Sequence, residues 1–87
     1  MNQSILFPDI QSWDEELSAV KFPAQQSGAL IECVAPLSYL SQFGEQVTNA
    51  EQALAVFNAN RFEIEELAEQ LIEDEEYNQL GMIELNS

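Results

Sequence analysis

Histidine is absent from this chain, cysteine occurs once, and only 2 of the 87 residues are basic. Without histidine, the chain lacks the commonest general base and metal ligand. A single cysteine cannot form an intrachain disulfide or a cysteine-based zinc site. The 16 acidic residues bring the formal net charge to -14. That charge argues against direct nucleic-acid binding, which needs lysine and arginine to displace counterions from phosphates, and against docking on anionic lipid.

Long apolar runs are missing as well, since none approaches the ~20 residues that span a bilayer. The first four residues, Met1–Ser4, contain no basic residue, unlike the start of a signal peptide. Because Cys33 is the lone thiol, we expect a cytoplasmic protein. We predict one domain over residues 1–87, and its small size and high charge favour a homodimer that would bury more apolar surface.

Apolar residues alternate with polar ones in the first half of the chain. The segments 19–25 and 29–35 each place apolar side chains on one side, which predicts two half-buried strands joined as a hairpin. Residues 5–8 read as a short extended piece, and residues 12–15 fit either one capped helical turn or a simple turn. Residues 82–85 read as a final short strand.

The loop of the hairpin sets the register of its two strands. We favour a four-residue loop over residues 25–28, because it places Lys21 opposite Glu32 as an opposite-charge pair. The alternative, a two-residue loop at Ser27 and Gly28, would place Lys21 opposite Val34.

The second half of the chain has helical periodicity. Residues 36–43 predict a short helix, and a capping box over residues 48–51 opens a pattern that continues to Glu76 or Tyr77. Asn60 and Arg61 interrupt its apolar stripe. We favour one long helix over two helices that meet near Asn60, because no glycine or proline intervenes.

Together these elements predict an α+β fold. A small antiparallel sheet of three or four strands combines the N-terminal hairpin with the C-terminal strand, and a short helix and a long amphipathic helix cover one face of it.

Several short motifs resemble one family of small bacterial proteins, the domain of unknown function 1488. They are Phe7-Pro8-Asp9, Trp13-Asp14-Glu15, Val20-Lys21-Phe22-Pro23-Ala24, Leu30-Ile31-Glu32-Cys33 and the run from Phe57 through Asn60-Arg61 to Ala68. Their order and spacing carry the resemblance over nearly the whole chain. The resemblance implies a compact α+β domain and no assigned activity, so it supplies no catalytic or binding residues.

Carboxylates on the long helix are the clearest candidate for function. Glu51, Glu66, Glu69 and Glu73 lie opposite the apolar stripe, Glu76 flanks them, and one aromatic residue falls toward them. The candidate partner-binding residues are Phe62, Glu66, Glu69, Glu73 and Glu76. Such a face is most often simply solvated. It could also bind a basic partner protein by charge complementarity or hold a divalent cation.

Two ion pairs are expected to be structural. Arg61 and Glu65 are four positions apart on the helix, and Lys21 faces Glu32 across the hairpin.

These observations favour a non-catalytic interaction protein that presents an acidic helix face to a basic partner. The alternatives are a structural or accessory protein with no charge-driven partner, and a small hydrolase or divalent-metal-dependent enzyme. A chain of this size has little room for a deep pocket. We therefore assign no catalytic, cofactor-binding or metal-binding residue.

Overall fold

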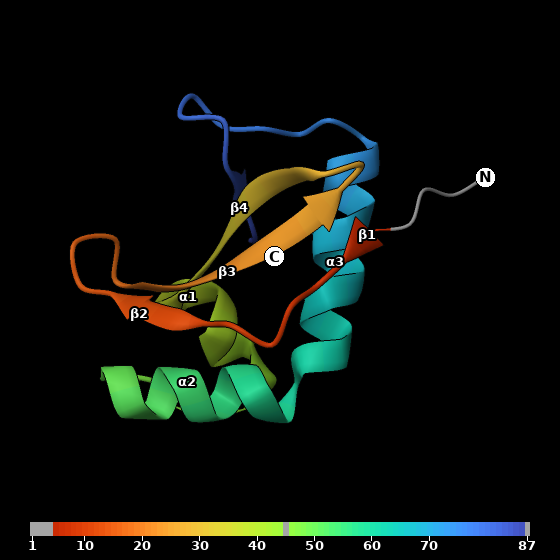
Figure 1. The fold of residues 1–87 in the computed structure, drawn as a ribbon. Helices are drawn as coiled ribbons and strands as arrows, with labels where there is room; N and C mark the ends of the chain where they lie inside the picture. Colours follow the sequence, from red (N-terminus) through yellow and green to blue (C-terminus); the bar gives the residue numbers. More distant parts are fainter. Residues whose placement is uncertain (1–4, 45, 87) are drawn as a thin grey trace.

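The computed structural model describes residues 5–44 and 46–86 and has the expected α+β fold, with a sheet packed against three helices (Figure 1). Residues 1–4, where we found no export signal, lie outside the described part. The elements in chain order are β1 (Ile5–Leu6), β2 (Ser12–Asp14), β3 (Ala19–Gln26), β4 (Ala29–Pro36), α1 (Leu37–Leu40), the 3-10 turn η1 (Ser41–Phe43), α2 (Ala50–Ala59), α3 (Arg61–Glu73) and β5 (Ile83–Glu84).

The described residues form a five-stranded sheet with β3 near its centre. One edge of β3 pairs with β4, and the other edge is shared by β2 at its start and β1 at its end. Pro23 falls in the gap between β1 and β2, where its missing N–H leaves no ladder hydrogen bond unmade. β5 pairs with β4 in parallel. The expected all-antiparallel sheet is therefore wrong at β5, because the chain returns to β4 through the helices and arrives in the same direction.

The hairpin between β3 and β4 turns at Ser27 and Gly28, whose φ angles are 52° and 83°. Positive φ at both central residues is typical of a type I′ turn, whose twist matches that of the flanking strands. Lys21 lies opposite Val34, so the four-residue loop that we favoured is wrong. Lys21 nevertheless reaches Glu32 along the diagonal, with 3.8 Å between Nζ and Oε2.

Residues 12–15 form no helical turn, because Ser12–Asp14 is strand β2. Trp13 pairs with Val20 of β3. The Asp14 side chain instead stabilises the turn that follows, since its Oδ1 accepts a hydrogen bond from the Leu17 backbone N–H at 2.9 Å.

Pro36 precedes α1, and polar residues or glycine lie at the other helix ends described below. The predicted helix over residues 36–43 is α1 followed by η1, and Gly44 ends it with a φ of 92°. Helix α2 is capped one residue later than the capping box suggested, because Asn49 Oδ1 accepts from the Gln52 N–H at 2.8 Å. The Gln52 side chain accepts in turn from the Thr48 N–H at 2.9 Å.

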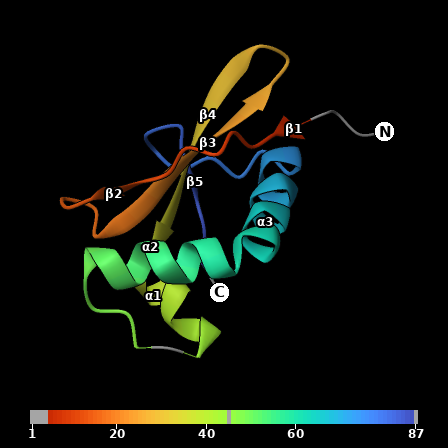
Figure 2. The same cartoon turned by 60° about the horizontal axis from the view of Figure 1, so that its bottom comes forward.

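The single long helix is wrong as well, because the chain changes direction between α2 and α3 (Figure 2). Asn60 has a φ of -119° and a ψ of 25°, outside the helical region. Its side-chain Nδ2 donates to the Val56 carbonyl at 2.9 Å, which is the local competition that makes asparagine favour helix ends. The bend lets both helices bury side chains against the sheet, and Phe57 of α2 and Ile64 of α3 are fully buried.

Helix α3 ends at Glu73, before the predicted Glu76 or Tyr77. The Glu76 N–H donates to the Leu71 carbonyl and the Glu75 N–H to the Ile72 carbonyl, both at 3.0 Å. Glu75 has a φ of 56°, so the end is a Schellman motif. A run of carboxylates is unfavourable in a last helical turn, where the dipole is negative.

The hydrophobic core lies between the three helices and one face of the sheet, which we call the inner face (Figures 1 and 2). Phe22 of β3 is at its centre, with ring centroids 4.9 Å from Phe57 of α2 and 6.2 Å from Phe7. The strand residues that share this cluster are Val20, Phe22, Ala24, Cys33, Ala35 and Ile83, and Leu85 joins them directly after β5. The outer face of the sheet points away from the helices.

Candidate functional site

The acidic face, which we define as Glu66, Glu69 and Glu73, runs along α3 away from its buried residues. Glu66 and Glu73 are exposed and Glu69 is half-buried, while Ile64 on the opposite side is fully buried. Within the described residues, none of the three carboxylates forms an ion pair with the chain's own cations. The acidic face therefore keeps its charge available to another molecule.

Glu76 does not belong to this face. It is exposed, but it follows the Schellman motif and lies outside α3. The structure thus brings four of the five predicted residues, Phe62 and the acidic face, onto one helix and leaves Glu76 in the turn after it.

Of the large hydrophobic residues in the described part of the chain, Phe62 is the most exposed, with 86% of its surface accessible. It is the second residue of α3 and borders a hollow of about 260 Å³ between this helix and the chain around β1. We call this hollow the Phe62 groove, and its lining residues are Ile5, Phe7, Phe62, Glu65, Glu66 and Glu69. Three hydrophobic side chains and three carboxylates therefore line one groove.

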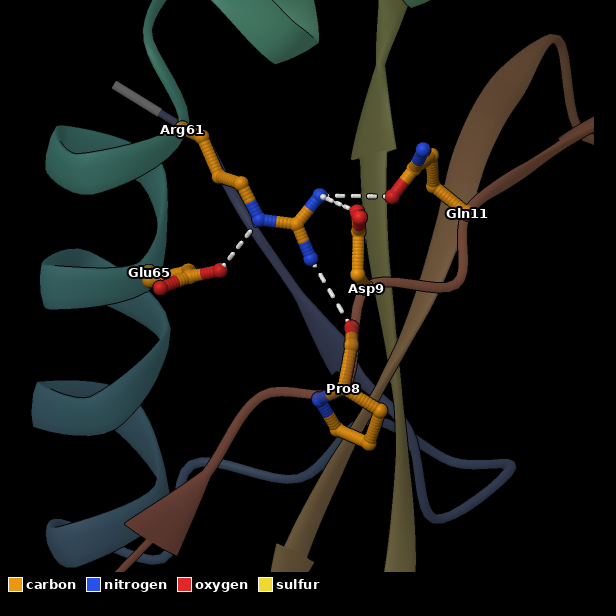
Figure 3. A network of polar contacts seen from close by, with 5 residues as sticks. All are labelled: Pro8, Asp9, Gln11, Arg61 and Glu65. Atoms are coloured by element: carbon orange, nitrogen blue, oxygen red, sulfur yellow. Dashed lines mark hydrogen bonds and ion pairs between the residues drawn. The ribbon is translucent and has the colours of Figure 1, made fainter.

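Arg61 connects α3 to the chain segment that follows Phe7, next to the Phe62 groove (Figure 3). Its Nε donates to Glu65 Oε2 at 2.6 Å on α3, and its Nη2 donates to the Pro8 carbonyl at 2.8 Å. Its Nη1 donates to Gln11 Oε1 at 2.6 Å and to Asp9 Oδ1 at 3.2 Å. We call these five residues the Arg61 clasp.

The Arg61 clasp also touches the core, because the guanidinium carbon lies 5.3 Å from the centroid of the Phe57 ring. The expected pair of Arg61 with Glu65 is thus present, and its side chains are each only 21% exposed. Sequence reasoning missed Pro8, Asp9 and Gln11. Their contacts hold the segment after Phe7 against α3, which fixes the shape of the groove.

A second hollow of about 540 Å³ lies on the other side of Glu66, between α3 and the α1–η1 segment. Burial and then the nearby Glu63 carboxylate raise the pKa of Tyr39, which borders this hollow. Its lining is mostly amide and carboxylate, with residues Tyr39, Gln42, Phe43, Glu63, Glu66, Leu67, Gln70 and Asn86. Glu66 therefore stands on a ridge between two hollows.

The other predicted pair is near the outer face of the sheet. Lys21 Nζ lies 3.6 Å from Asp14 Oδ2 and 3.8 Å from Glu32 Oε2. Both cations of the chain are therefore held by the protein's own carboxylates.

Two further observations concern the thiol and the grouping of possible metal ligands. Burial, reinforced by the neighbouring Glu32 carboxylate, raises the pKa of the Cys33 thiol to about 12, so the thiol stays protonated and unreactive near neutral pH. Across residues 5–44 and 46–86, no three His, Cys, Asp or Glu side chains are grouped closely enough to hold a metal ion. No helix in these ranges is both long and apolar enough to cross a bilayer.

Comparison with known proteins places the chain in a family. Residues 5–85 match the family described as "Protein of unknown function (DUF1488)". The chain belongs to this family, as its motifs suggested. It is 36% identical over 83 residues to "Uncharacterized protein YrdB" of Escherichia coli (strain K12), an alignment that covers 95% of this chain and 96% of that protein.

Two further DUF1488-related proteins agree with this assignment. The YrdB protein of Shigella flexneri is 35% identical over the same length. The crystal structure of a DUF1488 protein of unknown function from Shewanella loihica PV-4 superposes with a TM-score of 0.92 at 45% identity, covering 98% of this chain and 94% of that one. None of these descriptions names an activity.

The structure explains how two of the motifs that resemble DUF1488 work together. Phe7-Pro8-Asp9 and Asn60-Arg61 are more than 50 positions apart, yet the Arg61 clasp joins them directly. Phe7 is a wall of the Phe62 groove. These motifs therefore build the groove as well as stabilise the fold.

Proposed function

We propose that this protein is a non-catalytic interaction module whose α3 binds a basic segment of a partner protein. The observation that carries the proposal is the Phe62 groove, in which an exposed aromatic ring lies beside Glu66 and Glu69, whose carboxylates form no ion pair within the described residues. Complementary charge steers a basic partner to such a surface and selects it over acidic ones.

The groove suggests what the basic segment contains. Phe62 is 86% exposed, and a large aromatic side chain of this kind can act as an apolar anchor that contributes much of the affinity at an interface. We propose that an apolar side chain of the partner packs on Phe62 and Phe7 while flanking lysines or arginines pair with Glu66 and Glu69. The Arg61 clasp supports this binding because it holds the groove walls together before the partner arrives, so less ordering is needed on binding.

The net charge of the chain and its lone thiol bear on the class of partner and on the cellular compartment. A net charge of -14 disfavours binding to nucleic-acid phosphates, which supports a protein as the proposed partner. Cys33 is a buried free thiol, as is common in the reducing cytoplasm, where we propose that the protein acts.

A titration with a synthetic peptide of alternating lysine and leucine, followed by NMR chemical-shift changes, tests the proposal. We expect the largest shifts at Phe62, Glu66 and Glu69, and weaker binding as salt is added. Phe62→Ala should weaken binding at least about tenfold. The double variant Glu66→Gln/Glu69→Gln should weaken it and flatten the salt dependence, whereas the control Glu15→Gln/Glu16→Gln, with the same charge change in an exposed turn, should not.

Equal effects of the two double variants would show that the protein attracts cations through its total charge alone. The acidic face would then have no special role, and the protein would be an accessory protein with no charge-driven partner. Unaltered binding in Phe62→Ala would remove the groove from the proposal.

A further inference from the structure

The outer face of the sheet carries two exposed leucines on either side of a glutamine, at the end where the β3–β4 hairpin turns. Leu6 of β1 pairs with Gln25 of β3, which pairs with Leu30 of β4, so the three side chains lie next to each other on one face. Leu6 is 60% and Leu30 is 70% exposed. We call Leu6 together with residues 25–30 the neutral tip.

The neutral tip is free of charge in a protein that is otherwise strongly acidic. No residue from Phe22 to Ile31 or from Ile5 to Pro8 is ionisable in the neutral range, although the whole chain has a net charge of -14. A second copy brings the same negative charge, so two copies repel each other least where both surfaces are neutral. A basic partner gains nothing there, because no carboxylate in these segments could pair with it.

Among the residues that the structure describes, no helix covers the tip. Helices α1, α2 and α3 pack on the inner face (Figure 2), and Leu6 and Leu30 point to the other side. A contact made by identical patches about a two-fold axis is self-complementary, so Leu6 of one copy can meet Leu30 of the other, and the reverse contact forms at the same time. Two sheets that pack face to face in this way lie about 10 Å apart.

We propose that two copies of this chain associate through the neutral tip, outer face against outer face. The tip supplies few residues compared with the roughly 20–30 a side of a standard interface. The dimer is therefore weak, with a dissociation constant on the order of 100 µM. The proposal is independent of the partner site on α3, which lies on the opposite side of the sheet.

Sedimentation equilibrium over roughly 10 µM to 1 mM protein, at about 0.05 and 0.5 M sodium chloride, tests the proposal. We expect a monomer–dimer equilibrium that becomes tighter at high salt, because screening reduces the repulsion between two acidic copies. This direction is opposite to that expected for the basic partner, so the two proposals fail separately.

The matched variants are Leu30→Glu and Leu80→Glu. Both leucines are exposed, at 70% and 76%, so neither change should unfold the protein, which circular dichroism can verify. Leu30→Glu should weaken the dimer at least about tenfold, because it places like charges in the contact, whereas Leu80→Glu, outside the tip, should have little effect. A monomeric wild type at the highest concentration and salt, or equal effects of the two variants, would overturn the proposal.

Discussion

Replacing Arg61 with alanine removes the side chain that connects α3 to the segment between β1 and β2. The guanidinium donates four hydrogen bonds, to Glu65, Gln11, Asp9 and the Pro8 carbonyl, over distances of 2.6 to 3.2 Å. Only 21% of the Arg61 and Glu65 side chains is exposed. Arg61→Ala would leave the Glu65 carboxylate half-buried without its cation.

The magnitude follows from these contacts. A hydrogen bond to a charged group contributes about 1.5–3 kcal/mol and a neutral one about 0.5–1.5 kcal/mol. The Asp9 side chain is 91% exposed, so that pair contributes little. Because one side chain makes all of these contacts, their energies are not additive. We expect Arg61→Ala to lower the free energy of unfolding by about 2–4 kcal/mol, and the Tm by on the order of 10–25 °C for a domain of this size.

Urea and thermal unfolding of Arg61→Ala, Arg61→Lys and Lys21→Ala measure this effect. Lys21→Ala is the matched control, because it also removes one positive charge, but Lys21 makes only looser pairs at 3.6 and 3.8 Å and should cost less than about 1 kcal/mol. Arg61→Lys should restore less than half of the loss, since an ammonium cannot replace the guanidinium fork. If Arg61→Ala and Lys21→Ala cost the same, only net charge matters and the Arg61 clasp is not a structural element.

Further predictions concern salt, the core and the thiol. Added sodium chloride should raise the Tm by screening the acidic residues, and magnesium or calcium should raise it no more at matched ionic strength; a selective divalent shift would favour a metal site. Phe22→Ala should cost about 3–5 kcal/mol by opening a cavity, whereas Phe62→Ala, at 86% exposure, should stay within about 0.5 kcal/mol; chemical denaturation would compare them. The raised pKa of Cys33, about 12 against a usual 9.0, means that its contribution to stability is full below pH 9 and is lost toward pH 12, at up to about 1.4 kcal/mol per pH unit. The free energy of unfolding of Cys33→Ala should therefore fall less steeply with pH over that range than that of the wild type. Identical pH dependence of the two proteins would contradict the raised pKa of Cys33.

Local patterns predicted the parts of this fold that depend on local physics. Strand alternation identified β3 and β4, and the apolar stripe identified the buried positions of α3, because burial selects side chains at a fixed spacing. The pair of Arg61 with Glu65 also follows from spacing along one helix. The candidate residues on α3 were found in this way.

The hairpin register was mispredicted because we gave the Lys21–Glu32 ion pair more weight than the conformational preference of the turn. The Lys21–Glu32 pair is worth only about 0.2–1 kcal/mol, and it can form on the diagonal as well as directly across. Turn geometry is stricter, and Ser27 takes a positive φ of 52° that serine adopts less readily than asparagine or glycine. The sequence therefore contained only a weak signal for the two-residue loop.

Contacts between distant segments were beyond local reasoning. Pro8 and Arg61 are 53 positions apart, and no periodicity links them. The hint in the sequence was chemical, since Arg61 is the one cation in a helix with many carboxylates and its stem borders the apolar stripe. The parallel direction of β5 was missed for a similar reason, because it depends on how the helices carry the chain back to β4.

That parallel strand has a consequence for the order of folding. β3 and β4 are neighbours in sequence and can form a hairpin in about 1–10 µs. β5 reaches Cys33 from Ile83, so its docking must close a loop of about fifty residues, which is entropically slower. Ile83 and Leu85 are nonetheless fully buried. We therefore expect β5 to dock last and to complete the exclusion of water from the core. Substitutions in β5 should accelerate unfolding more than they slow folding.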